Sequence, residues 1–142
     1  MDRQIGLLDT SVLIHSLTHD EWSDSATELL NQIERGQRRV YVDAVVVHEM
    51  TYAYLHYRKG ASRDEIATTV AALLDWSGVV GPKADLQAAV ALWKADRGLG
   101  FVDAYLCIRA EREGLPVYTV NRKDFLRQGV DAPDLRELMG TG

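Results

Sequence analysis

The chain has 142 residues, of which 46% are hydrophobic and 26% are charged, and its formal net charge at pH 7 is −5. This composition is typical of a soluble globular protein, so we expect one domain over residues 1–142. The longest apolar runs fall short of the roughly 18 residues that a membrane span needs, and the acidic balance argues against an indiscriminate nucleic-acid binder. Cys107 is the only cysteine, which excludes an internal disulfide and favours a cytoplasmic location.

The first predicted element is a strand over residues 5–8, which ends on Asp9. The run is short, apolar and branched, as in a buried strand. Functional sites in α/β proteins form just outside the carboxyl ends of strands, and a carboxylate is costly to bury without a partner. We therefore expect Asp9 either to meet a cation or to cap the helix predicted over residues 11–17.

A second carboxylate stands out in the helix predicted over residues 44–57. Val45 and Val46 precede Glu49 by four and three positions, so helical periodicity places Glu49 on an apolar face. That face is an unusual place for an unpaired carboxylate. A buried ion pair or hydrogen bond is the structural alternative to a functional role.

The third and fourth polar positions follow later in the chain. Asp103 begins a helix predicted to end at Gly114, and an aspartate in a first turn is by itself a routine cap. A last strand over residues 116–120 is followed by Asn121 and then by Asp124. The other predicted strands cover residues 40–42 and 79–80, and the other predicted helices cover residues 20–36, 62–75, 84–97 and 134–139.

Strands alternate with helices along the whole chain. This order predicts an α/β fold, a three-layer sandwich with a mainly parallel central sheet. In a parallel sheet, strand ends and the starts of the following helices share one edge. We therefore expect a site that combines residues from distant parts of the chain, namely Asp9, Glu49, Asp103, Asn121 and Asp124.

Converging carboxylates repel one another, and a hard divalent cation removes that repulsion. Ligands that are all oxygen atoms favour Mg²⁺ or Mn²⁺ over zinc. Such a site can activate a water molecule and shield the charge of an attacked phosphate. Thr10, Ser11 and Thr119 are expected to hold ligand waters or to orient the carboxylates from behind.

Basic residues flank the last of these polar positions. Arg122, Lys123 and Arg127 could hold RNA phosphates beside the site. For each of them, a role as an ordinary solvated surface charge is the alternative.

Four segments carry a resemblance to a known family. Leu8-Asp9-Thr10-Ser11-Val12-Leu13, His48-Glu49, Val102-Asp103-Ala104 and the stretch from Thr119 to Phe125 resemble, in order, the motifs of the PIN-domain ribonucleases. The short single-domain form resembles the VapC toxins of toxin–antitoxin pairs. The resemblance implies an endoribonuclease that depends on Mg²⁺ or Mn²⁺, with Asp9, Glu49 and Asp103 as its metal-binding acids. It also implies a homodimer and inhibition by a cognate VapB-like antitoxin.

The sequence departs from the family pattern at one position. Many members have an aspartate where this chain has Asn121, although other members also have asparagine. Asn121 and Asp124 are therefore two alternatives for the fourth site residue.

Other functions are alternatives to a PIN-domain ribonuclease. A phosphatase of the haloacid dehalogenase type also begins with a strand that ends in Asp, but it needs a second Asp two residues later, where this chain has Ser11. The remaining alternatives are a PIN protein of RNA processing that is not a toxin, and a catalytically weak module that binds RNA or a protein partner.

Overall fold

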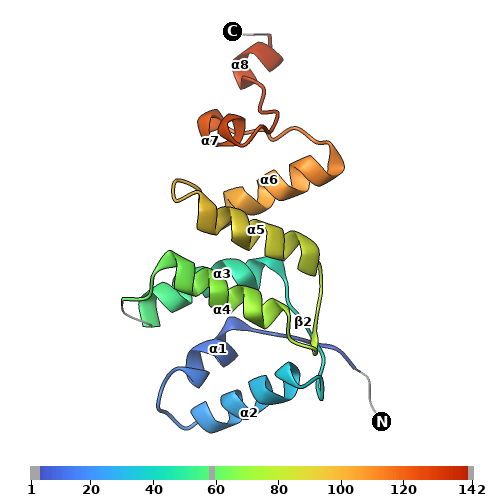
Figure 1. The fold of residues 1–142 in the computed structure, drawn as a ribbon. Coiled ribbons are helices and arrows are strands. Elements are labelled where there is room, and N and C mark those ends of the chain that lie inside the picture. The colour runs from blue at the N-terminus through green and yellow to red at the C-terminus, as the bar shows by residue number, and fades with distance from the viewer. Residues whose placement is uncertain (1–3, 58–59, 141–142) are drawn as a thin grey trace. The chain divides into compact units, whose positions relative to one another are not determined.

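The computed structural model describes residues 4–57 and 60–140 (Figure 1). Contacts between Cα positions divide the chain into two compact units, Met1–Gln87 and Ala88–Gly142. We call them the first and the second unit. The helix α5 (Lys83–Ala95) begins in the first unit and continues into the second.

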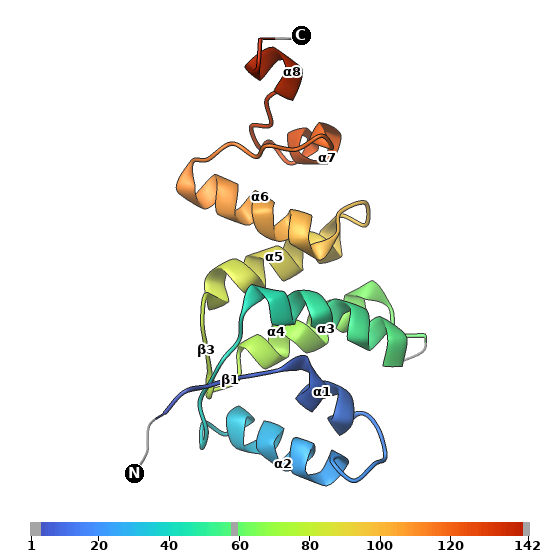
Figure 2. The ribbon, with the colours of Figure 1, turned by 180° about the vertical axis from the view of Figure 1, so that it is seen from behind.

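The first unit contains a parallel sheet of three short strands, in the order β1 (Gly6–Leu7), β2 (Val40–Tyr41) and β3 (Val79–Val80). Gly6 lies opposite Val40, and Val40 lies opposite Val79. Parallel neighbours need long crossover connections, and helices fill them here (Figure 2). The predicted α/β class with a parallel sheet is confirmed.

Four helices complete the first unit: α1 (Thr10–Ser16), α2 (Ser23–Glu34), α3 (Ala44–Tyr57) and α4 (Arg63–Leu74). α1 packs against α2 and α3, and α3 packs against α4. The core of this unit consists of apolar helix residues at helical spacing, together with Val42 after β2, and it buries Leu13, Ile33, Val42, Val47, Met50, Val70 and Leu74.

A serine cap and a glycine shape two connections of the first unit. Ser62 accepts a hydrogen bond from the backbone N–H of Glu65 at 3.1 Å and so caps α4, an interaction that typically contributes about 1 kcal/mol. Gly78 precedes β3, where a Cβ atom would lie 2.1 Å from the carbonyl oxygen of Arg38. Only glycine allows the chain to approach this closely.

The second unit is helical in the part that the structure describes. It contains α6 (Phe101–Glu113), α7 (Arg122–Arg127) and α8 (Leu135–Leu138). Phe101, Ala104, Cys107 and Ala110 form the buried side of α6. The helix ends at Gly114, which has the left-handed φ of 65° that glycine adopts easily.

Two expectations about strands are wrong: the first strand, expected to be buried, is exposed, with Leu7 exposed at 82%, and the last strand is absent from the described residues. Residues 116–120 run without regular secondary structure, with Tyr118 and Val120 exposed at 66% and 92%. The backbone N–H of Val117 donates instead to the carbonyl of Asp131 at 2.8 Å. A strand requires a neighbouring strand, and the described residues of the second unit contain none.

Candidate functional site

Asp9 lies between β1 and α1, at the carboxyl end of the strand. Its Oδ2 accepts a hydrogen bond from the backbone N–H of Ser11 at 3.1 Å, so Asp9 is the N-cap of α1. Hydrogen bonds from Ser11 lower the pKa of Asp9. The side chain is therefore an ionised, exposed carboxylate at the edge of a parallel sheet.

The two hydroxyl residues after Asp9 differ in their surroundings. Ser11 is exposed and bonds to Asp9, whereas Thr10 is 4% exposed. The hydroxyl of Thr10 is buried and has no hydrogen-bond partner among the described residues. A buried hydroxyl without a partner is uncommon and costs free energy of folding. Its position next to Asp9 fits a site at which water or a cation is held.

Glu49 lies in the middle of α3, and its predicted apolar, buried setting is wrong. Glu49 is exposed, and it shares its side of the helix with Val45, which is 64% exposed, and Tyr52, which is 65% exposed. The buried side of α3 carries Val47 and Met50 instead. Val45, four positions before Glu49, therefore does not mark a core face. The carboxylate of Glu49 needs no buried partner.

Asp103 lies in the first turn of α6, in the second unit. Its charge acts on Cys107, one turn further along the helix. Burial raises the pKa of the Cys107 thiol to about 11, and the negative charges of Asp103, Asp96 and Asp124 add to this effect. Three carboxylates therefore lie near one buried thiol within the second unit.

Asn121 and Asp124 belong to one hydrogen-bonded network. The Nδ2 of Asn121 donates to Oδ2 of Asp124 at 2.8 Å, and Nη1 of Arg127 donates to Oδ1 of Asp124 at 2.7 Å. Arg127 also donates through Nη2 and Nε to Oδ2 of Asp96, at 2.8 and 3.1 Å. The bonds from Asn121 and Arg127 lower the pKa of Asp124, and those from Arg127 lower the pKa of Asp96.

Asp96 is a member of this network that sequence reasoning missed. Besides Arg127, its side chain accepts from Nε2 of Gln128 at 2.6 Å and from the backbone N–H of Gly98 at 3.0 Å. The only local signal is the spacing Asp96-Arg97-Gly98, which is typical of an Asx turn. Its long-range partner Arg127 is 31 residues away in sequence.

The predicted phosphate-binding residues differ in their partners. Nε of Arg122 donates to the carbonyl of Ala132 at 2.6 Å, and Nη1 of Arg122 lies 3.8 Å from Oδ2 of Asp134. Arg127 pairs with Asp96 and Asp124, as described above, and its side chain is still 41% exposed. Lys123 is exposed.

The predicted ligands are divided between the units. Asp9 and Glu49 belong to the first unit, and Asp103, Asn121 and Asp124 belong to the second. The described residues include no group of three or more His, Cys, Asp or Glu side chains placed to hold a metal ion. The chemistry of the donors nevertheless fits a hard divalent cation, because exposed carboxylates, an amide oxygen and a partnerless buried hydroxyl all offer oxygen.

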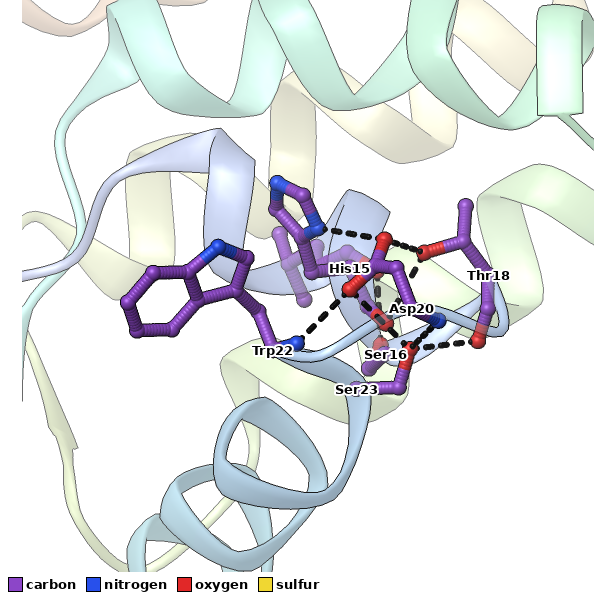
Figure 3. A network of polar contacts seen from close by, with 7 residues as sticks. His15, Ser16, Thr18, Asp20, Trp22 and Ser23 are labelled. Atoms are coloured by element: carbon purple, nitrogen blue, oxygen red, sulfur yellow. Dashed lines mark hydrogen bonds and ion pairs between the residues drawn. The ribbon is translucent and has the colours of Figure 1, made fainter.

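A hollow of about 400 Å³ lies beside Ser11 on the first unit, between α1 and α2. Figure 3 shows the polar network at its border, where Asp20 accepts from Nδ1 of His15 and from the backbone N–H of Trp22, both at 2.8 Å. Thr18 also donates to Asp20, at 2.7 Å. Val12, Ala26, Leu29 and the exposed ring of Trp22 give the hollow an apolar lining.

The sequence model of the PIN domain family matches residues 6–130. The chain belongs to the PIN domain family. Members are generally nucleases that use divalent metals, and the predicted PIN-like α/β fold is confirmed. A search of curated proteins and a search of solved structures returned no match to this chain.

Among the described residues, no helix of this PIN domain combines the length and the apolar character that crossing a membrane requires.

Proposed function

We propose that this PIN domain is an endoribonuclease that hydrolyses RNA phosphodiester bonds with the help of Mg²⁺ or Mn²⁺. The observation that carries the proposal is the family match over residues 6–130, which includes Asp9, Glu49, Asp103, Asn121 and Asp124. The match includes most of each unit, which supports the proposal that residues 1–142 act as one domain.

In this proposal, Asp9, Glu49 and Asp103 hold the cation, and Asn121 and Asp124 complete the site. The cation, when bound, lowers the pKa of water and neutralises charge on the attacked phosphate. The chain's own contribution is to supply ionised carboxylates. Asp9 is suited to this role because its pKa is lowered and its side chain is exposed.

Three neighbouring residues with hydroxyl side chains, Ser11, Thr119 and Thr10, support the proposed site. Ser11 fixes the carboxylate of Asp9 through its backbone N–H. Thr119 accepts a hydrogen bond from the backbone N–H of Asn121 at 3.0 Å and so fixes the start of α7. We assign to Thr10 the role of binding a ligand water, since its buried hydroxyl has no other partner in the described part of the chain.

RNA phosphates are the proposed partners of Arg122, Lys123 and Arg127. Lys123 is exposed, and Arg127 retains N–H groups beyond those that bind Asp96 and Asp124. Contacts to phosphates position an RNA strand without reading its sequence. These residues are therefore expected to affect binding of all RNA substrates alike.

We also propose that the protein is the toxin of a VapBC-type pair, a cytoplasmic homodimer inhibited by a VapB-like antitoxin. The order of the motifs supports this subtype. The apolar hollow beside Ser11, with its exposed Trp22, is a suitable surface for an apolar segment of the antitoxin. Its place next to Asp9 would let a bound antitoxin cover the site.

RNA cleavage by the purified protein tests the proposed activity. A structured RNA pool is incubated with Mn²⁺ or Mg²⁺, with and without EDTA, and beside Asp103→Asn. We expect cuts that require metal and that are absent in Asp103→Asn, because this change removes a negative charge from the metal site. The matched control is Glu111→Gln, which removes an exposed carboxylate from the same helix and should leave cleavage unchanged.

Two results would contradict the proposed metal-dependent cleavage of RNA by this protein. Cuts that persist in Asp103→Asn would show that the activity belongs to a contaminant. A wild-type protein that neither cuts RNA nor gains thermal stability from Mn²⁺ would contradict the proposal, since a bound ion stabilises the folded state by mass action.

A further inference from the structure

The hollow of about 400 Å³ between α1 and α2 is lined by residues of the first unit. Two rings line it: the indole of Trp22, which is 59% exposed, and the imidazole of His15, whose side chain is 39% exposed. Ser11 and Ser25 add hydroxyl groups to an otherwise apolar lining. Tryptophan is highly buried on average, so an exposed indole at a hollow indicates a binding surface.

One carboxylate holds both rings. Oδ2 of Asp20 accepts from Nδ1 of His15, and Oδ1 of Asp20 accepts from the backbone N–H of Trp22, both at 2.8 Å (Figure 3). Thr18 also donates to Asp20, and these three hydrogen bonds lower the pKa of Asp20 to about 2. The carboxylate therefore stays ionised at neutral pH, and the two rings are held in place before any ligand binds.

The ionised carboxylate also determines which hydrogen bond His15 can offer to a ligand. Because a carboxylate only accepts, Nδ1 of His15 carries the hydrogen of this contact, and Nε2 of the neutral imidazole is an acceptor. Among the described residues that line the hollow, none is Lys, Arg, Asp or Glu. The hollow therefore suits a flat, uncharged group that stacks on an indole and donates an N–H.

The position of the hollow indicates where such a group comes from. Ser11 lines the hollow, and its backbone N–H donates to Oδ2 of Asp9 at 3.1 Å. An RNA strand with a phosphate near Asp9 would thus bring a neighbouring base to the hollow. Unpaired RNA bases are recognised by stacking on aromatic rings and by hydrogen bonds to their edges. An apolar protein side chain would contact Trp22 but leave Nε2 of His15 without a partner, which costs free energy.

We propose that this hollow binds an unpaired nucleobase of the RNA substrate, with Trp22 stacked on the base and Nε2 of His15 accepting a hydrogen bond from an N–H of the base. This inference rests on the proposed action on RNA and adds a base contact to it. Contacts to phosphates only position a strand, whereas contacts to bases make binding depend on sequence. An antitoxin segment in the same hollow would exclude the base.

The first test measures stacking without metal or cleavage. Binding of a labelled, single-stranded adenine oligoribonucleotide is followed by fluorescence anisotropy in EDTA at pH 8. Trp22→Ala is expected to weaken binding about 5- to 150-fold, the usual effect of removing one aromatic ring from under a base. Trp22→Phe keeps a ring and should weaken binding less. The control is Leu17→Ala, an exposed apolar side chain after α1 that is not part of the hollow lining.

The second test measures the hydrogen bond to His15. In a second RNA, unsubstituted purine replaces each adenine; purine stacks on a ring but has no N–H to donate. We expect the wild type to bind the adenine RNA roughly 2- to 10-fold more tightly than the purine RNA. His15→Asn keeps an amide donor for Asp20 but lacks Nε2, so this variant should bind both RNAs equally.

The outcomes separate this inference from the proposed nuclease. Wild-type affinity of Trp22→Ala for the adenine RNA, or no binding by the wild type, overturns the base site, whatever the cleavage assay shows. A preference for adenine that persists in His15→Asn overturns the role of Nε2. If the wild type binds RNA through Trp22 and His15 as expected but gives no metal-dependent cuts, the nuclease falls and the base site stands.

Discussion

At the scale of single residues, Asp9 has both a structural and a chemical role open to it. The carboxylate caps α1 by accepting from Ser11, and the same hydrogen bonds lower its pKa and keep it ionised. The sequence left open whether Asp9 caps a helix or meets a cation. The structure shows that Asp9 caps α1. The same hydrogen bonds keep its carboxylate ionised, as a cation ligand must be, so the two roles are compatible.

Cys107 gives a prediction that tests the charges around Asp103. The thiol is 3% exposed, and burial followed by the charge of Asp103 raises its pKa to about 11. Since only the thiolate reacts, we expect slow modification by a thiol reagent at mildly alkaline pH compared with the chain unfolded in urea. Asp103→Asn should speed modification by lowering the pKa of Cys107. Equal rates of thiol modification in the folded and unfolded chains would contradict a raised pKa of Cys107.

The same thiol has a consequence for stability. The folded chain keeps Cys107 protonated up to about pH 11, whereas the reference pKa is 9.0. The contribution of the protonated Cys107 to the free energy of unfolding is therefore fully present below pH 9 and is lost as the pH rises through 11. The reason is that the thiol ionises first in the unfolded chain, which stabilises that state. Replacing Cys107 with Ala should remove this part of the alkaline loss, which thermal unfolding at several pH values would show.

At the scale of elements, the connection between α1 and α2 is held by one carboxylate. Asp20 accepts from Thr18, from the backbone N–H of Trp22 and from His15, and these bonds lower its pKa to about 2 (Figure 3). Sequence periodicity predicted that the second helix begins at residue 20, but α2 begins at Ser23. The three residues before α2 instead form the turn that Asp20 organises.

This arrangement predicts a specific loss of stability in acid. Because the folded pKa of Asp20 lies below the model-peptide value of 3.8, its contribution is present above pH 3.8 and is lost as the pH falls toward 2. We expect Asp20→Asn to lower the melting temperature near neutral pH, with the difference from wild type shrinking as the pH approaches 2. Glu21→Gln, an exposed neighbour, is the control. A difference that does not change with pH would rule this explanation out.

The elements also show which features can be predicted from sequence. Helices and their caps follow local patterns, and Ser62 caps α4 at the start of the helix predicted over residues 62–75. The strand expected over residues 116–120 was wrong because a strand depends on a partner that local sequence does not specify. Glu49 was misplaced for a related reason, since the valines before it predicted a core face that the fold leaves exposed.

At the scale of the whole molecule, the family match extends over both units, although each predicted ligand belongs to only one of them. The sequence singled out Asp9, Glu49, Asp103 and Asn121 as candidates because they form ordered motifs. It could not find Asp96, whose role depends on a contact with Arg127 across 31 residues. Candidate residues from distant segments are suggested by motif order, whereas a long-range contact such as that between Arg127 and Asp96 requires the structure.

The central claim is the proposal that Asp9 and Asp103 are ligands of a divalent cation in this PIN domain. Calorimetric titration of Mn²⁺ into the wild-type protein, Asp9→Asn and Asp103→Asn tests it most directly, with Glu111→Gln as the control. We predict that the wild type and the control bind Mn²⁺ and that each aspartate variant loses binding. Wild-type affinity in either aspartate variant would contradict the claim.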